Sequence, residues 1–398
     1  MNQELEADIR RALDHASARA PHAPTGLADR IVARSRRRRT RAQALVAALT
    51  VAAVAAGVGV AVRGGDTLDQ TAVTPTPSPT ATAPPPAPEP VEKVWPEAVW
   101  KIPAKLPDGP ALRPRVFIYG RTLLLETWAS FEKANALYTY DLATQEIRKI
   151  ADIRTKKGVY ASGYAAGAGL VVWQTIEKVE GRMSSRFWSV PISGGEPAEI
   201  RTDSVPGRAD TLAVAGDRLA FSVMEGGVFT VPLGGGTVTP VPGADRYHIL
   251  RWPFVGSVGR YTPNGETAFQ ELLNVDTGAT SRAVVRPGEK NVVCGVWMCS
   301  GGRPDGTPFY RPRDGSQERD LPSWSLFGLA ADRFMTLYRG DLGIDVLHDL
   351  RTGKSGDYGY RDDDSGKSIG VEPALGDGRL LTYPLGDHNV VIDLSRID

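Results

Sequence analysis

Cys294 and Cys299 are the two thiols of the chain, and their spacing decides whether they can react with each other. In one straight strand they would point to opposite faces, whereas a tight hairpin through residues 295–298 would bring them opposite each other. A metal site would need further ligands nearby in the sequence, and none are present. The spacing therefore predicts a structural disulfide and no metal site.

The run Arg361–Ser368 contains two incomplete ligand motifs. Gly366-Lys367-Ser368 matches the end of a phosphate-binding loop, but Arg361 stands where that loop needs its first glycine. Asp362-x-Asp364-x-Gly366 has the spacing of a calcium loop, but Pro373 stands where that loop needs a glutamate. We interpret the run as a solvated acidic loop, and the sequence predicts no cofactor.

Hydrolase chemistry has little support in the sequence. No Gly-x-Ser-x-Gly motif is present, since the residues around Ser257 miss the spacing. His248, His348 and His388 fall in three different repeats of the pattern described below, and we interpret each as a packing or surface residue. The same holds for four aromatic residues that could form a binding face, Tyr247, Trp252, Tyr358 and Tyr360. We therefore predict no catalytic residue.

The 21 residues 42–62 carry no charge and are long enough to cross a bilayer. Directly before them stand several arginines, among them Arg36, Arg37, Arg38, Arg39 and Arg41. Arginine beside a crossing stays on the cytoplasmic side, which predicts a cytoplasmic N-terminus and an extracytoplasmic remainder. A cleaved signal peptide would have a shorter apolar run and a shorter basic segment, and a lipoprotein would need a cysteine just after the run.

Charge and composition divide the rest of the chain. Residues 1–41 contain ten arginines and five acidic residues, a formal charge of +5, whereas the remaining 37 basic and 41 acidic residues give −4. The whole chain is at +1, which argues against a general nucleic-acid binder. Residues 63–94 form a Pro/Thr-rich linker that favours extended polyproline II conformation.

Residues 95–398 contain a repeated strand pattern: two or three apolar residues at alternating positions, a polar residue or proline, an aliphatic residue, then a turn. The polar or proline position recurs at 141, 191, 232, 274, 312, 349 and 393, with a mean step of 42 residues. About 20 residues before most of these positions lies a second apolar run, such as Leu123-Leu124-Leu125. This period with several strands per repeat is typical of a β-propeller, and it predicts seven blades, with six and eight as alternatives.

Two details of the pattern bear on the fold. The last repeat ends at Asp398 without room for an outermost strand, so we expect residues 98–106 to supply it and close the ring. The fifth repeat is the weakest, because Arg311 and Arg313 stand at positions where the pattern expects apolar side chains.

With its repeats and its apolar run, the chain resembles membrane-anchored bacterial propellers of the WD-repeat or TolB-like kind, although no Trp-Asp dipeptide ends a repeat. Residues 1–62 are similar in layout to bacterial single-pass anti-sigma-factor-like proteins, without the zinc-binding His/Cys motif of many of them. The resemblance implies a plasma-membrane protein with an outer sensor domain.

The cytosolic segment 1–41 contains two short amphipathic stretches, for which simple membrane orientation offers no reason. Leu5, Ile9, Leu13, Leu27 and Ile31 recur near helical spacing. This stripe predicts a short helical segment that docks on a cytosolic protein, such as a sigma factor. The alternative is that the arginines hold the segment on the anionic inner leaflet.

Together these features predict a non-enzymatic, membrane-anchored extracytoplasmic propeller that binds a protein, peptide or glycan and signals to a cytosolic partner. The alternative is an extracytoplasmic hydrolase or lyase with its site at the mouth of the propeller channel.

Overall fold

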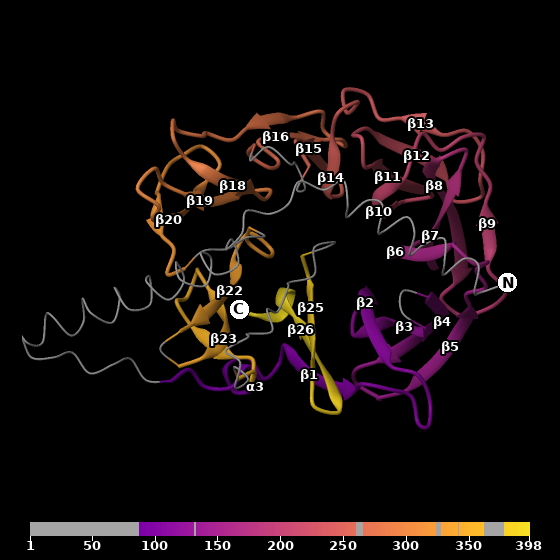
Figure 1. Ribbon diagram of the computed structural model, residues 1–398, viewed down its shortest axis with the longest axis horizontal. Coiled ribbons are helices and arrows are strands. Elements are labelled where there is room, and N and C mark those ends of the chain that lie inside the picture. The colour runs from indigo at the N-terminus through magenta and orange to yellow at the C-terminus, as the bar shows by residue number, and fades with distance from the viewer. Residues whose placement is uncertain (1–86, 131–132, 260–265, 324–327, 341, 362–377) are drawn as a thin grey trace, which may run out of the picture. The chain divides into compact units, whose positions relative to one another are not determined.

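The computed structural model describes residues 87–398 apart from 131–132, 260–265, 324–327, 341 and 362–377. These residues contain 26 strands in seven antiparallel sheets. The sheets stand side by side around a common centre (Figure 1), as the blades of a propeller do. The predicted all-β fold with seven blades is confirmed.

Blades I to V each have four strands, ordered from the centre outward as in the sequence. Blade I comprises β2 (Leu112–Tyr119), β3 (Thr122–Ser130), β4 (Lys133–Asp141) and β5 (Ile147–Asp152); blade II comprises β6 (Tyr160–Gly167), β7 (Leu170–Val179), β8 (Arg182–Pro191) and β9 (Ala198–Ile200). Blade III comprises β10 (Ala209–Ala215), β11 (Arg218–Val223), β12 (Val228–Pro232) and β13 (Thr239–Pro240). Blade IV comprises β14 (His248–Arg251), β15 (Phe254–Ser257), β16 (Glu271–Asn274) and β17 (Thr280–Arg282); blade V comprises β18 (Lys290–Cys294), β19 (Met298–Gly302), β20 (Pro308–Pro312) and β21 (Arg319–Asp320).

The last two blades have three described strands each. Blade VI comprises β22 (Phe334–Arg339), β23 (Ile344–Asp349) and β24 (Ser355–Asp357); blade VII comprises β25 (Leu380–Leu385), β26 (His388–Asp393) and β1 (Val99–Pro103). Two short helices complete the described elements, α3 (Val91–Val94) and the 3₁₀ helix η1 (Leu394–Arg396).

The apolar runs of the second strands form the core because side chains of a strand alternate between its two faces. Leu123 and Leu125 pack into the core cluster shared by blades VII and I, whereas Leu124 packs into the cluster shared by blades I and II. The same division recurs around the ring, so that seven hydrophobic clusters each lie between two adjacent blades. Each blade is thus held by apolar contacts on both faces.

The polar position of the repeat caps the hairpin that follows it. Asp141 Oδ1 accepts hydrogen bonds from the backbone N–H groups of Ala143 and Thr144 at 2.8 and 2.9 Å. Asn274, Asp349 and Asp393 accept from the backbone in the same way in their own blades. The hydrogen bonds from Thr144 and Ala143 hold the pKa of Asp141 below its ordinary value. The repeated residue is therefore a turn-forming residue.

Blade V forms in spite of its two arginines, because the terminal nitrogens of both guanidinium groups have acceptors, although the two Nε atoms are buried without a hydrogen-bond partner among the described residues. Arg311 is buried and bonds both carboxylate oxygens of Glu289 at 2.5 and 2.6 Å, and Glu318 at 2.7 Å. Arg313 donates to the carbonyl oxygens of Phe269, Gln270 and Gly295. A buried guanidinium is tolerated only with such partners. Two of the acceptors of Arg313, the carbonyls of Phe269 and Gln270, directly precede β16 of blade IV.

The ring closes between blades VII and I as predicted. β1 pairs antiparallel with β26, with Val99 opposite Ile392 and Pro103 opposite His388, so the N-terminal strand completes the last sheet. Ile102 of β1 is 1% exposed and packs in the cluster between these blades. Arg379 pairs with Asp393 at 2.7 Å and also donates to the carbonyl of Gly120 in blade I at 2.6 Å.

The propeller begins before residue 95, because residues 89–94, assigned from sequence to the linker, already pack on blade VI. The backbone N–H of Asp357 donates to the carbonyl of Glu89 at 2.8 Å. Gly356 lets α3 approach, since a Cβ at this position would lie 2.9 Å from the Cα of Val91.

Within the part of the chain that the structure describes, no helix has the length and apolar character needed to cross a membrane. The expected crossing at residues 42–62, the arginines before it and the amphipathic stripe of residues 1–41 lie outside the described residues.

We predict that Ile102→Ala lowers the free energy of unfolding by about 2–4 kcal/mol, because it opens a cavity in the cluster that closes the ring. The matched control is Lys101→Ala on the same strand, whose side chain is half exposed and pairs only with Glu92 at the surface. Its cost should stay below about 1 kcal/mol. Urea unfolding of both variants measures this, and equal costs would show that β1 does not close the ring.

Candidate functional site

A cavity of about 510 Å³ lies where the innermost strands of blades I to IV begin. Its wall is formed by residues of β2, β6, β10 and β14, together with Gln174 of β7, Arg208, Met224 and Phe269. Four separate blades therefore contribute to one hollow, which is where propellers can collect side chains from distant parts of the sequence.

β-Bulges decide which side chains reach this cavity. The pairing register shifts between Pro114 and Val116 in β2, and between Ala209 and Thr211 in β10, which leaves Arg115 and Asp210 without a partner on the neighbouring strand. Gly163 and Leu250 occupy the same position in β6 and β14. All four residues line the cavity. A bulge re-aims the extra residue, and here it does so in four consecutive blades.

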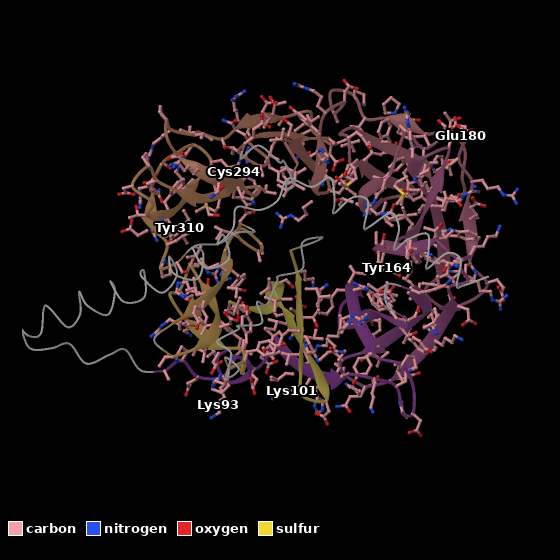
Figure 2. The ribbon with its side chains drawn as sticks, viewed as in Figure 1. Lys93, Lys101, Tyr164, Glu180, Cys294 and Tyr310 are labelled. Atoms are coloured by element: carbon pink, nitrogen blue, oxygen red, sulfur yellow. A yellow bond between two sulfur atoms is a disulfide. The ribbon has the colours of Figure 1, made fainter. Side chains whose placement is uncertain are left out.

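Tyr164, Glu126 and Arg115 link blades I and II at this wall. The Tyr164 hydroxyl donates to Glu126 at 2.7 Å, and Arg115 pairs with the same carboxylate. Glu126 is 1% exposed, so its charge depends on these partners. Burial, followed by the charge of Glu126, raises the pKa of Tyr164 well above its ordinary value, which keeps the phenol protonated. Figure 2 shows Tyr164 on the inner side of the blades, between β2 and β6.

Gln174 and Ser185 of blade II bind the first residue of β10 in blade III. Gln174 Nε2 donates to the carbonyl of Ala209 at 3.0 Å, while the backbone N–H of Ala209 donates to Ser185 Oγ at 2.8 Å. Ser185 Oγ in turn donates to Gln174 Oε1 at 2.5 Å. This part of the cavity wall is therefore held in place by hydrogen bonds among Gln174, Ser185 and the backbone of Ala209.

Asp210, Ser222 and His248 form the corresponding link between blades III and IV. His248 Nδ1 lies 2.6 Å from Asp210 Oδ2, and Ser222 Oγ donates to the other oxygen of Asp210. The backbone N–H of Ile249 donates to Ser222 Oγ at 3.1 Å. A carboxylate that orients an imidazole is one half of an acid–base site, but Ser222 contacts the carboxylate and not the imidazole. Among the described hydrogen bonds, no hydroxyl is activated by His248.

Three of the polar residues at or behind this wall occupy one position of the repeat, which the predicted strand pattern did not include. Glu126 and Ser222 directly follow three-residue apolar runs in β3 and β11, and Gln174 follows Trp173 in the equivalent strand β7. Each side chain points toward the next blade. A polar residue that recurs directly after the apolar run is the sequence signal by which these side chains could have been identified.

The predicted disulfide residues lie in blade V. Cys294 pairs with Cys299 across β18 and β19, and their sulfurs are bonded. Asp332 of the connection to blade VI accepts hydrogen bonds from the N–H groups of Val296, Trp297 and Met298 at 3.2–3.3 Å, and so holds the turn. Burial raises the pKa of Asp332 above its ordinary value despite these donors. Neither cysteine lines the cavity, although both pack in one core cluster with the lining residue Phe269.

The other residues weighed from sequence do not gather at one place. His348 bonds Ser355 Oγ at 2.8 Å within blade VI, and burial lowers its pKa, whereas His388 contacts Asp387. The aromatic residues pack against core clusters: Tyr247, Trp252, Tyr358 and Tyr360. Residues 362–377, which include most of the acidic run, lie outside the described residues. Within the described residues, no three His, Cys, Asp or Glu side chains are grouped so as to hold a metal ion.

No protein-family profile matches the chain, and no curated protein matches it. Among solved structures, YCF48 from Cyanidioschyzon merolae is 8% identical with a TM-score of 0.43, over 74% of this chain and 98% of that one. TolB from Acinetobacter baumannii is 13% identical with a TM-score of 0.33, over 54% of this chain and 55% of that one. Hydrazine synthase of Kuenenia stuttgartiensis is 11% identical with a TM-score of 0.40, over 71% and 95%. Nothing about function follows from likenesses at this level.

We predict that Tyr164→Phe lowers the free energy of unfolding by about 1–2 kcal/mol, because Glu126 loses a donor in a buried position. Tyr160→Phe on the same strand is the control: Tyr160 is 43% exposed, and its loss should cost less than about 0.5 kcal/mol. Urea unfolding measures both. If the two variants are equally stable, the link between blades I and II does not contribute.

Proposed function

We propose that the propeller is a non-enzymatic binding module and that its ligand, a protein, peptide or glycan segment, occupies the cavity of blades I to IV. The observation that carries this proposal is the wall itself: its polar side chains are fixed by hydrogen bonds between consecutive blades. A preformed wall binds without the cost of ordering its own side chains.

A propeller hydrolase or lyase is the second candidate, and the Asp210–His248 pair is the observation in its favour. The hydrogen bonds and ion pair of the neighbouring groups argue against a hydrolase or lyase. Glu126 is engaged by Arg115 and Tyr164, and Ser222 by Asp210, so that the potential base and nucleophile do not face each other. A binding function therefore accounts for this geometry better than a catalytic one, because it does not require a base and a nucleophile that face each other.

We further propose that residues 42–62 anchor the protein in the plasma membrane, with residues 1–41 in the cytoplasm and the propeller outside. The arginines at 36–39 and 41 support this orientation. A bonded cysteine pair in the propeller is in keeping with an oxidising compartment. Leu5, Ile9, Leu13, Leu27 and Ile31 would then offer an apolar stripe to a cytosolic partner such as a sigma factor, which would couple ligand binding to the cell interior.

The binding proposal is tested by photo-crosslinking in intact cells, with benzoylphenylalanine in place of Met224. This side chain is 45% exposed and lines the cavity. The control position is Glu180, on the exposed hairpin of blade II, which Figure 2 shows at the outer side of the ring. We expect an adduct from position 224 and none from position 180. The same adducts from both positions, or none from position 224, would contradict the proposal.

The cytosolic part is tested by a pull-down from cytosol with residues 1–41, beside the same segment carrying Leu5→Ala, Ile9→Ala and Leu13→Ala. A partner that reads the apolar stripe is retained by the first and lost by the second. Binding to anionic lipid depends mainly on the arginines and weakens with salt. If the triple variant retains everything that the parent retains, the segment has a membrane role only.

A further inference from the structure

Arg115 lines two cavities, and Arg113 lines one of them. The cavity of about 510 Å³ includes Arg115, and a second one of about 360 Å³ includes both arginines. The second cavity lies at the closing seam of the ring, where the start of β2 meets Tyr383 and Pro384 of β25. Asn389 Nδ2 fixes this seam by donating to the carbonyl of Leu112 at 2.8 Å. The two cavities thus adjoin along the first residues of β2.

Both guanidinium groups are held in place by aromatic rings. The guanidinium of Arg113 lies 3.8 Å from the centre of the Trp128 ring, and that of Arg115 lies 5.7 Å from the centre of the Tyr164 ring. Stacking leaves the N–H edge of a guanidinium available for a planar acceptor such as a carboxylate. A stacked arginine has also lost most of its rotamer freedom before a ligand arrives.

The balance of charge around these cavities favours an anion. The carboxylates at the wall are already bonded, Glu126 by Arg115 and Tyr164, Asp210 by Ser222 and His248. Arg113 and Arg208, in contrast, have no carboxylate partner among the described residues, and Arg208 lines the larger cavity. Cationic groups that have no carboxylate partner at a preformed cavity attract acidic ligands.

The rings in this region distinguish between two kinds of acidic ligand. A sugar is usually held by stacking on an open aromatic face, but Trp128 lines neither cavity, and Arg115 lies over one face of the Tyr164 ring. Tyr383 and Phe269, which also line the cavities, are each 4% exposed. An extended peptide needs no open ring, because its backbone and carboxylates make polar contacts.

We propose that the two cavities together bind an acidic peptide segment in extended conformation, with carboxylates held by Arg113 and Arg208. This inference rests on the proposed binding function and gives it a ligand class. The segment would run from the closing seam beside blade VII past β2 toward the wall of blades II to IV.

The test uses the full-length chain purified in detergent and a fluorescein-labelled octapeptide of alternating serine and glutamate, measured by fluorescence anisotropy. The matched probe has glutamine in place of each glutamate. We expect the glutamate peptide to bind at least tenfold more tightly and to weaken as salt is raised. Arg113→Ala and Arg208→Ala should each raise the Kd about tenfold, the effect of losing one charge-assisted contact.

Two further variants make the result specific. Arg182→Ala removes an exposed arginine from the outer hairpin of blade II and should change the Kd less than about twofold. Arg113→Lys keeps the charge but not the planar fork, and its Kd should lie between those of the parent and Arg113→Ala. Circular dichroism confirms that each variant is folded.

Equal binding of the two peptides, or an equal effect of Arg182→Ala and Arg113→Ala, would overturn the inference. So would equal or tighter binding of an oligogalacturonate of the same charge, which would assign the site to acidic glycans. If the glutamate peptide does not bind but position 224 still crosslinks in cells, the ligand class is wrong and the binding function stands. The absence of crosslinking would reject the function itself.

Discussion

Every blade of this propeller buries apolar side chains on both of its faces, and the rest of the structure depends on that requirement. A β-strand sends successive residues to opposite sides, so one run such as Leu123-Leu124-Leu125 serves two different interfaces. A row of such sheets would leave an apolar face exposed at each end. Only a closed ring removes both ends, and the pairing of β1 with β26 provides the closure.

The same alternation explains why the cavity has a rigid polar wall. The residue after each apolar run continues the face that meets the next blade, and there Glu126, Gln174 and Ser222 bind groups of that blade. Near the centre of the ring, the blades are therefore joined by hydrogen bonds in place of apolar contacts, because buried polar groups need partners. The site that we propose for ligand binding is held by the same blade-to-blade contacts that stabilise the ring.

Much of the fold could be predicted from the sequence, because the features that set it are local. The period of the repeats and the turn-capping residues both depend on short stretches of chain. The cavity could not be predicted in the same way. Arg115 and Asp210 reach it through bulges, which depend on the pairing of two strands and break the alternation used to assign faces.

Other features escaped prediction because their partners are distant in sequence. Asp210 contacts His248, which lies 38 residues further along the chain, and Arg311 pairs with Glu289, which lies 22 residues before it. In a pattern of apolar residues Arg311 is only an exception, whereas the fold places the carboxylates of Glu289 and Glu318 against its terminal nitrogens. The weakest repeat in the sequence is thus an ordinary blade in space.

The closing strand also sets the order in which the domain can be completed. β1 precedes the strands of blades I to VI in the chain, yet its partner β26 follows all of them. Until β26 is synthesised, the backbone donors of β1 and the apolar side chain of Ile102 have no native partner, which exposes β1 to wrong pairing. Lys101 and Pro103, which flank Ile102, oppose such pairing through charge and through a missing N–H donor. The contact between β1 and β26 spans nearly the whole propeller domain. The domain can therefore complete its fold only after β26 is present, and it should fold more slowly than domains whose contacts are local.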